Sequence, residues 1–163
     1  MSNLENKQQT AVVRLLSGKD AEQIKRLDDL SGDYMEQWVA ELEANESSDG
    51  NYGIFLKGDT LIGYCGLNTT EDSGDEIEDH IDAHHSKRDD TRLLYTVYID
   101  DSYQGQGYGK QLISEAIEDI TDPTTKQTIY VKSSCYGLKT FYESIGFKSI
   151  NDEANYLIMA LIR

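Results

Sequence analysis

The sequence is poor in the residues that build disulfide-rich, fibrous or membrane-spanning proteins. It contains one proline and two cysteines in 163 residues, and Cys65 and Cys135 lie far apart. Two distant cysteines make no disulfide framework, so we expect a reducing, cytoplasmic environment. The mean hydropathy is −0.58, and no apolar run is long enough for a helix to span a membrane. Residues 1–7 lack an apolar segment, so we expect no secretory signal.

Positive charge is also scarce. The chain has 15 Lys and Arg against 30 Asp and Glu, a formal net charge of −15, and its isoelectric point is near 4.4. Such a chain repels nucleic acids and anionic membranes, so we expect neither as a partner and favour a cationic one. The length suits one domain, and 38% hydrophobic residues suffice for a packed core. We expect a monomer or a homodimer.

We predict a flexible N-terminus over residues 1–10, followed by one domain over residues 11–163. Hydrophobic patterns predict strands at 11–16, 52–56, 60–67, 93–99, 128–132, 147–150 and 156–162. They predict helices at 18–30, from Asp33 to Leu42, at 77–84, at 109–121 and at 136–145. A tight turn at 57–59 joins the second and third strands as a hairpin.

A strand, a helix and a strand follow one another at 93–99, 109–121 and 128–132. The first strand is a continuous apolar run, which is typical of a strand covered on both faces. A right-handed crossover makes the two strands parallel. We therefore predict an α/β (α+β) fold, with a mixed, mostly antiparallel sheet of six or seven strands, one parallel pair, and helices on both faces.

The most distinctive stretch is the glycine-rich loop between that strand and helix, from Tyr103 to Lys110. Gly105, Gly107 and Gly109 lack a Cβ, so the backbone can turn tightly and direct several N–H groups to one point. The helix N-terminus carries roughly half a positive charge, to which Lys110 adds a full one. The loop is therefore predicted to bind an anion.

Two common phosphate loops do not fit this stretch. A Walker loop needs glycine where Gln104 stands and Ser or Thr where Gln111 stands. A dinucleotide-binding fingerprint starting at Gly105 needs a small residue where Lys110 stands. The remaining pattern, Gln-x-x-Gly-x-Gly from Gln104, resembles the pyrophosphate loop of the GNAT N-acetyltransferase family. The preceding Val-Tyr-Ile run at 97–99 and the Phe-Tyr-Glu-Ser-Ile-Gly-Phe run at 141–147 resemble further motifs of that family.

The resemblance implies a single-domain GNAT fold with acetyl-CoA as cosubstrate and no metal. It implies that the parallel strand pair splays apart and that acetyl-CoA lies in the opening. The cofactor-binding residues that it implies are Val97, Tyr98, Ile99, Gln104, Gly105, Gln106, Gly107, Tyr108, Gly109, Lys110 and Ser134. Ser134 stands near the position where the family often has an asparagine. Tyr142 matches the position of the family's general acid.

The resemblance further implies that a primary amine of a small cationic molecule or peptide attacks the thioester directly in a ternary complex. Many family members carry a glutamate where this chain has Leu93, which leaves the general base open. Asp90, His84, His85 or a water held by Tyr95 are the alternatives. Because of Leu93, a catalytically silent module that binds CoA or a partner protein is the alternative function.

Residues 71–90 depart from the rest of the chain, with nine acidic residues against two basic ones and all three histidines of the sequence. We interpret this segment as an exposed excursion with a short helix around 77–84. It is a solvated mobile loop or an electrostatic collar that attracts a polycationic acceptor. A third reading is a metal site of a hydrolase, although Ile81 stands where a zincin motif needs glutamate.

Overall fold

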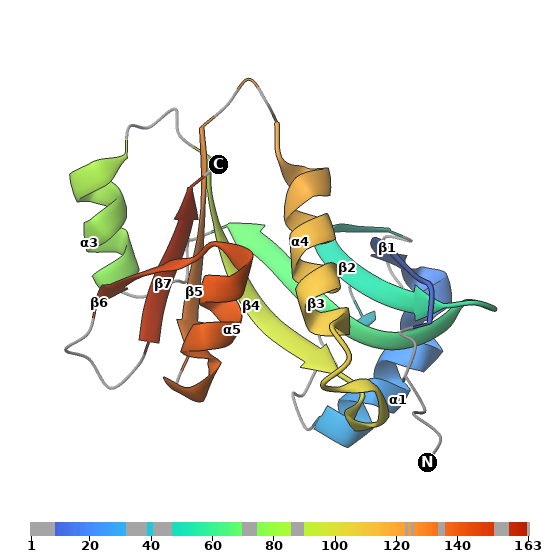
Figure 1. Cartoon of the computed structure of the whole chain (residues 1–163). Coiled ribbons are helices and arrows are strands. Elements are labelled where there is room, and N and C mark those ends of the chain that lie inside the picture. Colours follow the sequence, from blue (N-terminus) through green and yellow to red (C-terminus); the bar gives the residue numbers. More distant parts are fainter. Residues whose placement is uncertain are drawn as a thin grey trace, which may run out of the picture. The chain divides into compact units, whose positions relative to one another are not determined.

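The computed structural model describes residues 9–31, 39–40, 47–69, 75–85, 90–122, 124, 126–133, 136–151 and 157–162. The strands are β1 (Ala11–Ser17), β2 (Ser47–Leu56), β3 (Thr60–Thr69), β4 (Asp90–Ile99), β5 (Gln127–Ser133), β6 (Lys148–Asn151) and β7 (Leu157–Ile162). The helices are α1 (Ala21–Ser31), α3 (Asp75–His84), α4 (Tyr108–Ile120) and α5 (Lys139–Ile145), as Figure 1 shows. Short 3-10 turns at Gly18–Asp20, Asp101–Tyr103 and Tyr136–Leu138 precede α1, the glycine-rich loop and α5.

The seven strands form one mixed sheet in the order β1-β2-β3-β4-β5-β7-β6. Strands β4 and β5 are parallel, whereas β1 with β2, β5 with β7, and β6 with β7 are antiparallel. The predicted mixed sheet with one parallel pair is confirmed. By its contacts the chain divides into two compact units, one of Met1–Cys65 with Thr96–Glu115 and one of Gly66–Tyr95 with Ala116–Arg163.

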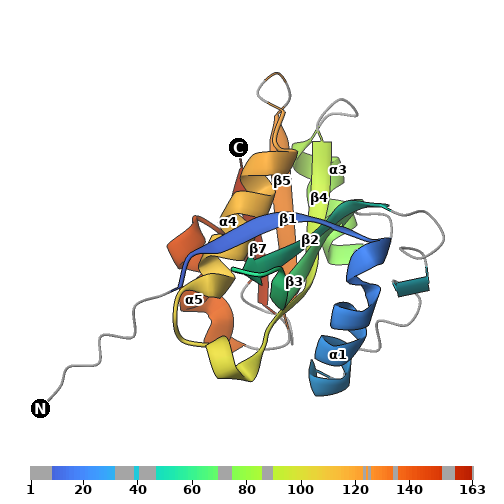
Figure 2. The same cartoon turned by 90° about the vertical axis from the view of Figure 1, so that its right-hand side faces the viewer.

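The first unit is built around β1, β2 and α1, which leaves the end of β1 (Figure 2). Its helix places Ile24 and Leu27, one turn apart, against Phe55, Leu61 and Tyr64, and all are buried. Asp20 precedes the helix, and its carboxylate accepts a hydrogen bond of 2.9 Å from the N–H of Ser17. That bond fixes the corner between β1 and α1.

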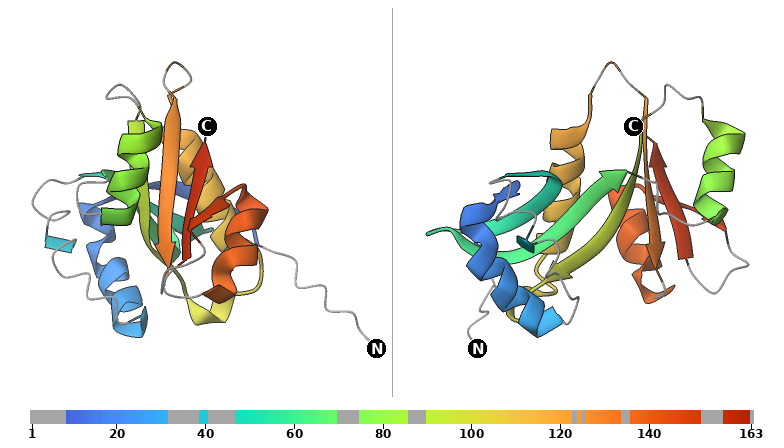
Figure 3. Two further views of the ribbon diagram at one scale, coloured as in Figure 1. Left: turned by 90° about the vertical axis from the view of Figure 1, so that its left-hand side faces the viewer. Right: turned by 180° about the vertical axis from the view of Figure 1, so that it is seen from behind.

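The second unit places α3 and α5 on opposite faces of its strands (Figure 3). On one face, Ile77 of α3 packs in a buried cluster with Tyr130, Ile158 and Ala160. Side chains alternate along β7, so Leu161 points to the other face. There a Cβ on Gly146, the residue that ends α5 with a φ of 117°, would come within 3.0 Å of Leu161.

The position of α3 corrects one expectation. The short helix is confirmed, but it is no solvated excursion, because Ile77 is completely buried and Ile81 packs against the same cluster. An apolar pair one turn apart is enough to bind the helix to the sheet. Residues 71–74 and 86–89 of the acidic segment lie outside the described residues.

Several boundaries also differ from the predicted ones. Strand β2 begins at Ser47 and β4 at Asp90, both earlier than predicted. The run from Leu93 to Ile99 is not covered on both faces throughout, since only Leu94 and Ile99 are buried and the others are half-buried. Of the helix predicted after Asp33, only residues 39–40 are described. No helix among the described residues is long and apolar enough to cross a membrane.

Candidate functional site

Strand β4 changes its conformation just after its pairing with β5. The paired stretch runs from Asp90 opposite Gln127 to Leu94 opposite Val131, while β4 itself continues to Ile99. Two residues beyond the paired stretch, Thr96 has a φ of +41°. A β-branched residue is strained in this region of φ, so the backbone departs from regular strand geometry at this point. Threonine is a good strand former, and nothing in the sequence marks this position.

The ring of Tyr95, the residue before Thr96, lies close to a glycine. In the second unit, a Cβ on Gly66 of β3 would lie 2.7 Å from Cζ and 2.9 Å from the hydroxyl oxygen of Tyr95. Only the missing side chain of Gly66 leaves room for the ring at this distance from β3. The sequence analysis gave Tyr95 as a residue that could hold a water molecule, but it did not show that Gly66 positions the ring.

The glycine-rich loop follows β4 in the first unit. Asp100 begins the turn by accepting a hydrogen bond of 3.0 Å from the N–H of Ser102. The side-chain amide of Gln104 then donates to the carbonyl of Ile99 at 2.8 Å and to the carboxylate of Asp101 at 3.0 Å. Gln104 therefore ties the loop back to the end of β4. This explains why a glutamine stands at the head of the loop.

Two of the glycines have backbone conformations that other residues rarely adopt. Gly105 has a φ of +74° and Gly107 a φ of +89°. The space where a Cβ of Gly105 would lie is open, with no atom within 4 Å. The glycines are thus required by the turn itself and leave the approach to the backbone uncovered.

The loop ends at the N-terminus of α4. The first helical hydrogen bond across this end runs from the N–H of Gln111 to the carbonyl of Gly107, at 3.1 Å. The N–H groups of Tyr108, Gly109 and Lys110 precede it and have no acceptor within the helix. Together with the helix dipole they make this end of α4 positive, which is the geometry that the predicted anion site requires.

The side chains of the predicted cofactor residues have different surroundings. Lys110 is exposed, whereas Tyr108 is buried, and its hydroxyl bonds to the backbone N–H and carbonyl of Gln9 at 2.8 and 3.2 Å. Tyr98 packs against the core of the first unit, and its hydroxyl donates to Asp101 at 3.4 Å. Burial and the charges of Asp101 and Asp100 raise the pKa of Tyr98. The side chains of Tyr98 and Tyr108 thus have structural contacts.

Tyr142 belongs to the second unit and is 5% exposed. Its ring meets those of Phe141 and Phe147 edge-on, with centroids 5.2 and 5.7 Å apart. Its carbonyl accepts the N–H of Phe147 at 3.1 Å, in the turn where Gly146 ends α5. The Tyr-x-x-x-Gly-Phe pattern therefore fixes the ring through aromatic contacts and a helix end. Ser134, the remaining predicted cofactor residue, lies outside the described residues.

Two of the candidate bases, Asp90 and His85, have other partners, and the third, His84, is exposed on α3. Asp90 accepts from Gln127 at 2.8 Å and from Arg92 at 3.3 Å. It precedes Tyr95 by five residues of β4, roughly 17 Å at about 3.4 Å per residue. His85 bonds to the hydroxyl of Tyr130 at 2.5 Å. His84, on the last turn of α3, is exposed.

Neither a thiol nor a metal provides another reactive centre among the described residues. Cys65 is completely buried, and burial raises the pKa of its thiol to about 12, so it stays protonated. No group of three or more His, Cys, Asp or Glu residues in the described ranges is placed to hold a metal ion.

Comparison with known proteins identifies the family. The model of the acetyltransferase (GNAT) domain matches residues 27–156. The fold is similar to a GNAT family acetyltransferase from Listeria monocytogenes, with a TM-score of 0.66 and 15% identity over 94% of this chain and 95% of that chain. The GNAT family N-acetyltransferase YhbS from Escherichia coli, solved in complex with CoA, has a TM-score of 0.65 and 14% identity over 96% and 83% of the two chains.

A plant structure has the same fold. Arabidopsis thaliana NAA60, in complex with acetyl-CoA, gives a TM-score of 0.65 and 15% identity over 94% of this chain and 99% of that chain. The comparison with curated proteins finds no significant match. The family match covers most of the chain, and the fold agrees with it. The chain belongs to the GNAT acetyltransferase family.

Proposed function

We propose that the protein is an acetyl-CoA-dependent N-acetyltransferase whose single catalytic domain covers residues 11–163. The observation that carries this proposal is the loop from Gln104 to Lys110, where two glycines of positive φ lead into the uncovered N-terminus of α4. Structures of the same fold from Escherichia coli and Arabidopsis thaliana contain CoA and acetyl-CoA. The acceptor is a primary amine of a small cationic molecule or peptide, which the net charge of −15 attracts.

In this proposal, backbone groups hold most of the cofactor. The N–H groups from Gln104 to Lys110 bind the pyrophosphate of CoA, and Lys110 adds a positive charge beside it. Main-chain groups of Val97, Tyr98 and Ile99 pair with the pantetheine arm, and Ser134 contacts CoA near the start of the last helix. The strained backbone at Thr96 supports this arrangement, because it interrupts the regular strand where the thioester is expected.

The chemistry is a direct transfer between two bound substrates. The amine nitrogen forms a bond to the acetyl carbonyl carbon, the C–S bond breaks, and CoA leaves as a thiolate. An amine of pKa about 10.4 is protonated at pH 7.4, and freeing it costs about 4 kcal/mol. Leu93 cannot take up this proton, Asp90 and His85 have other partners, and His84 is exposed on α3. We therefore assign proton removal to a water held by the hydroxyl of Tyr95, whose ring Gly66 positions.

Tyr142 is assigned to the leaving group, where its hydroxyl donates a hydrogen bond to the departing thiolate. Full proton transfer from a phenol of pKa about 10 to a thiolate of conjugate pKa about 8.5 is uphill by about 2 kcal/mol. A hydrogen bond during departure is therefore its contribution. Tyr142→Phe should lower kcat roughly 10- to 100-fold and change the Kd of acetyl-CoA by less than about threefold. Equal losses in both quantities would contradict this role, and Tyr64→Phe, another buried tyrosine, is the control.

The cofactor loop is tested with a matched pair of glycines. Gly105 and Gly58 both have positive φ, +74° and +86°, and open space at Cβ, but Gly58 lies in the turn between β2 and β3. Gly105→Val strains the loop and should weaken CoA binding roughly tenfold or more. Gly58→Val carries the same backbone strain and should leave the Kd unchanged. Calorimetry with CoA distinguishes them, and equal affinities in both variants would remove the loop from the cofactor site.

A silent module on the same fold is the second candidate, and Leu93 in place of an acidic residue favours it. The two functions differ in a single experiment. A panel of amines, including polyamines and lysine-rich peptides, is mixed with acetyl-CoA, and the free thiol of CoA is measured. Amine-dependent thiol release supports the enzyme. Tight acetyl-CoA binding without release for any amine supports the module.

A further inference from the structure

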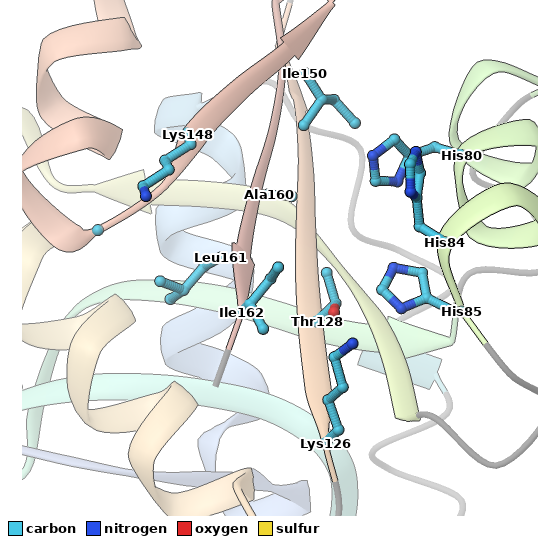
Figure 4. Close-up of a pocket in the computed structure, with 11 residues that line it drawn as sticks. His80, His84, His85, Lys126, Thr128, Lys148, Ile150, Ala160, Leu161 and Ile162 are labelled. Atoms are coloured by element: carbon cyan, nitrogen blue, oxygen red, sulfur yellow. The ribbon is translucent and has the colours of Figure 1, made fainter.

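A pocket of about 460 Å³ lies in the second unit and includes none of the residues assigned to the acetyl-CoA site. Figure 4 shows the rings of His80, His84 and His85 on one side of it, and Lys126, just before β5, with Thr128 of β5 on the other. Ile150 and Ala160 of the neighbouring strands form apolar walls. Lys148 also lines the pocket, but in Figure 4 it extends away from the histidines.

Thr128 carries the strongest sign that the pocket binds a ligand. Its side chain is 1% exposed, and its hydroxyl oxygen has no hydrogen-bond partner among the described residues. Buried hydroxyls normally have a hydrogen-bond partner. A polar group of a bound ligand would supply the partner that this hydroxyl lacks among the described residues. Residues 126, 128 and 130 alternate onto one side of β5, so Thr128 and Lys126 both face α3 together with Tyr130.

The histidines are fixed in place by Tyr130. Its hydroxyl lies 2.9 Å from Nδ1 of His80 and 2.5 Å from Nε2 of His85. The ring of His84 lies 4.3 Å from that of His80, centroid to centroid. A tyrosine hydroxyl can donate to one imidazole and accept from the other, which holds two rings at the rim of the pocket. Burial, followed by the neighbouring His84 and His85, lowers the pKa of His80.

Several charged groups surround the histidines. Asp90 of β4 is engaged with Arg92 and Gln127. Of the five acidic residues of α3, Glu78, Asp79 and Asp82 are exposed, away from the buried Ile77 face. Strand β7 carries no charged residue. From β5, Tyr130 and Lys126 face the rings, and burial raises the pKa of Tyr130 to about 12, so it stays neutral.

We propose that this pocket binds a small organic carboxylate. The carboxylate group accepts hydrogen bonds from the Lys126 amine, the Thr128 hydroxyl and a histidine N–H, and its apolar part lies on Ile150, Ala160 and Ile162. One lysine, one hydroxyl and a histidine N–H suit a monoanion better than a phosphate dianion.

The test uses hexanoate and acetate as probes on the full chain. Histidine signals are followed by NMR during titration at about pH 7. We expect saturable hexanoate binding that shifts these signals. Acetate should bind at least about tenfold more weakly, because it lacks the apolar part. No saturable hexanoate shift, or equal affinities for both probes, would overturn the proposal.

Variants separate this pocket from the proposed acetyl-CoA site. Lys126 is exposed, so Lys126→Gln leaves the fold intact and should weaken hexanoate binding at least about fivefold. Thr128→Val keeps the side-chain shape and should weaken it as well. Lys110→Gln, in the glycine-rich loop, should leave hexanoate binding unchanged. Unchanged hexanoate affinity in Lys126→Gln would refute the assignment, whatever the outcome of the CoA experiments.

Discussion

At the scale of single residues, the most constrained charge is the carboxylate of Asp20. It is 2% exposed and receives two hydrogen bonds of 2.9 Å from the guanidinium of Arg14, in addition to that from Ser17. The guanidinium in turn lies over the ring of Phe55, 3.8 Å from its centroid. Burial by itself would raise the pKa of Asp20, but the hydrogen bonds from Arg14 and Ser17 lower it overall. The pair therefore stabilises the corner between β1 and α1.

Asp20→Asn should lower the free energy of unfolding by about 2–3 kcal/mol, because it leaves the half-buried Arg14 without its counter-charge. Since the pKa of Asp20 is lower in the folded state, its stabilisation is complete above the unfolded pKa near about 4. It is lost as the pH falls through the lowered folded value. Urea unfolding between pH 7 and pH 2 checks this, and the difference between the two proteins should shrink at the acid end. Asp29→Asn, at an exposed position of α1, is the control.

Residue types alone could predict part of the candidate site. The glycine-rich loop was predicted as an anion site because an ordinary turn before a helix does not need three alternating glycines. Tyr142 was found by family resemblance, and its buried ring agrees with a fixed position. Gly66 under Tyr95 and the unpaired hydroxyl of Thr128 were missed, since both depend on which strand lies opposite. No local pattern contains that information.

At the scale of elements, β4 combines a regular half with a strained one. Its N-terminal half pairs with β5 up to Leu94, and Thr96 then adopts a φ of +41°. A non-glycine residue in this region costs about 1–3 kcal/mol, which the surrounding sheet must supply. The strain lies where the strand is expected to turn its backbone groups toward the pantetheine arm.

Two substitutions in the same strand test this strain. Thr96→Gly removes the β-branched side chain at positive φ and should raise the free energy of unfolding by about 0.5–1.5 kcal/mol. Thr91→Gly, in the regular paired half, should lower it by about 1 kcal/mol, because glycine weakens a regular strand. Chemical denaturation measures both. A loss of stability in both variants would show that the backbone at Thr96 is unstrained.

Hydrophobic periodicity predicted the existence and order of most elements, since each buries one face. It was less informative for α3, where Ile77 and Ile81 are the apolar contacts of a helix otherwise rich in acidic residues. The charges suggested a solvated segment, but two isoleucines one turn apart on one face decided the packing. The acidic composition of α3 reflects its solvent-exposed face, whereas its packing depends on the two isoleucines of the face that contacts the sheet.

At the scale of the whole molecule, the formal charge of −15 is the dominant property. It favours the approach of the cationic acceptor proposed above and disfavours that of CoA, which is itself anionic. The glycine-rich loop, with the N-terminus of α4 and Lys110, acts against this repulsion over a short distance only. The balance between the two decides how salt affects cofactor binding, because salt screens distant charges more than adjacent ones.

Raising the salt concentration should therefore leave CoA affinity unchanged or improve it. Between 0.1 M and 1 M salt the screening length falls from about 10 Å to about 3 Å, which removes the repulsion by distant acids but not contacts at the loop. Calorimetric titration of CoA over this range measures the effect. Lys110→Gln should weaken binding at low salt and show a steeper improvement with salt. A steep fall in the affinity of the unaltered protein would mean that local charge attraction controls the approach of CoA even at long range.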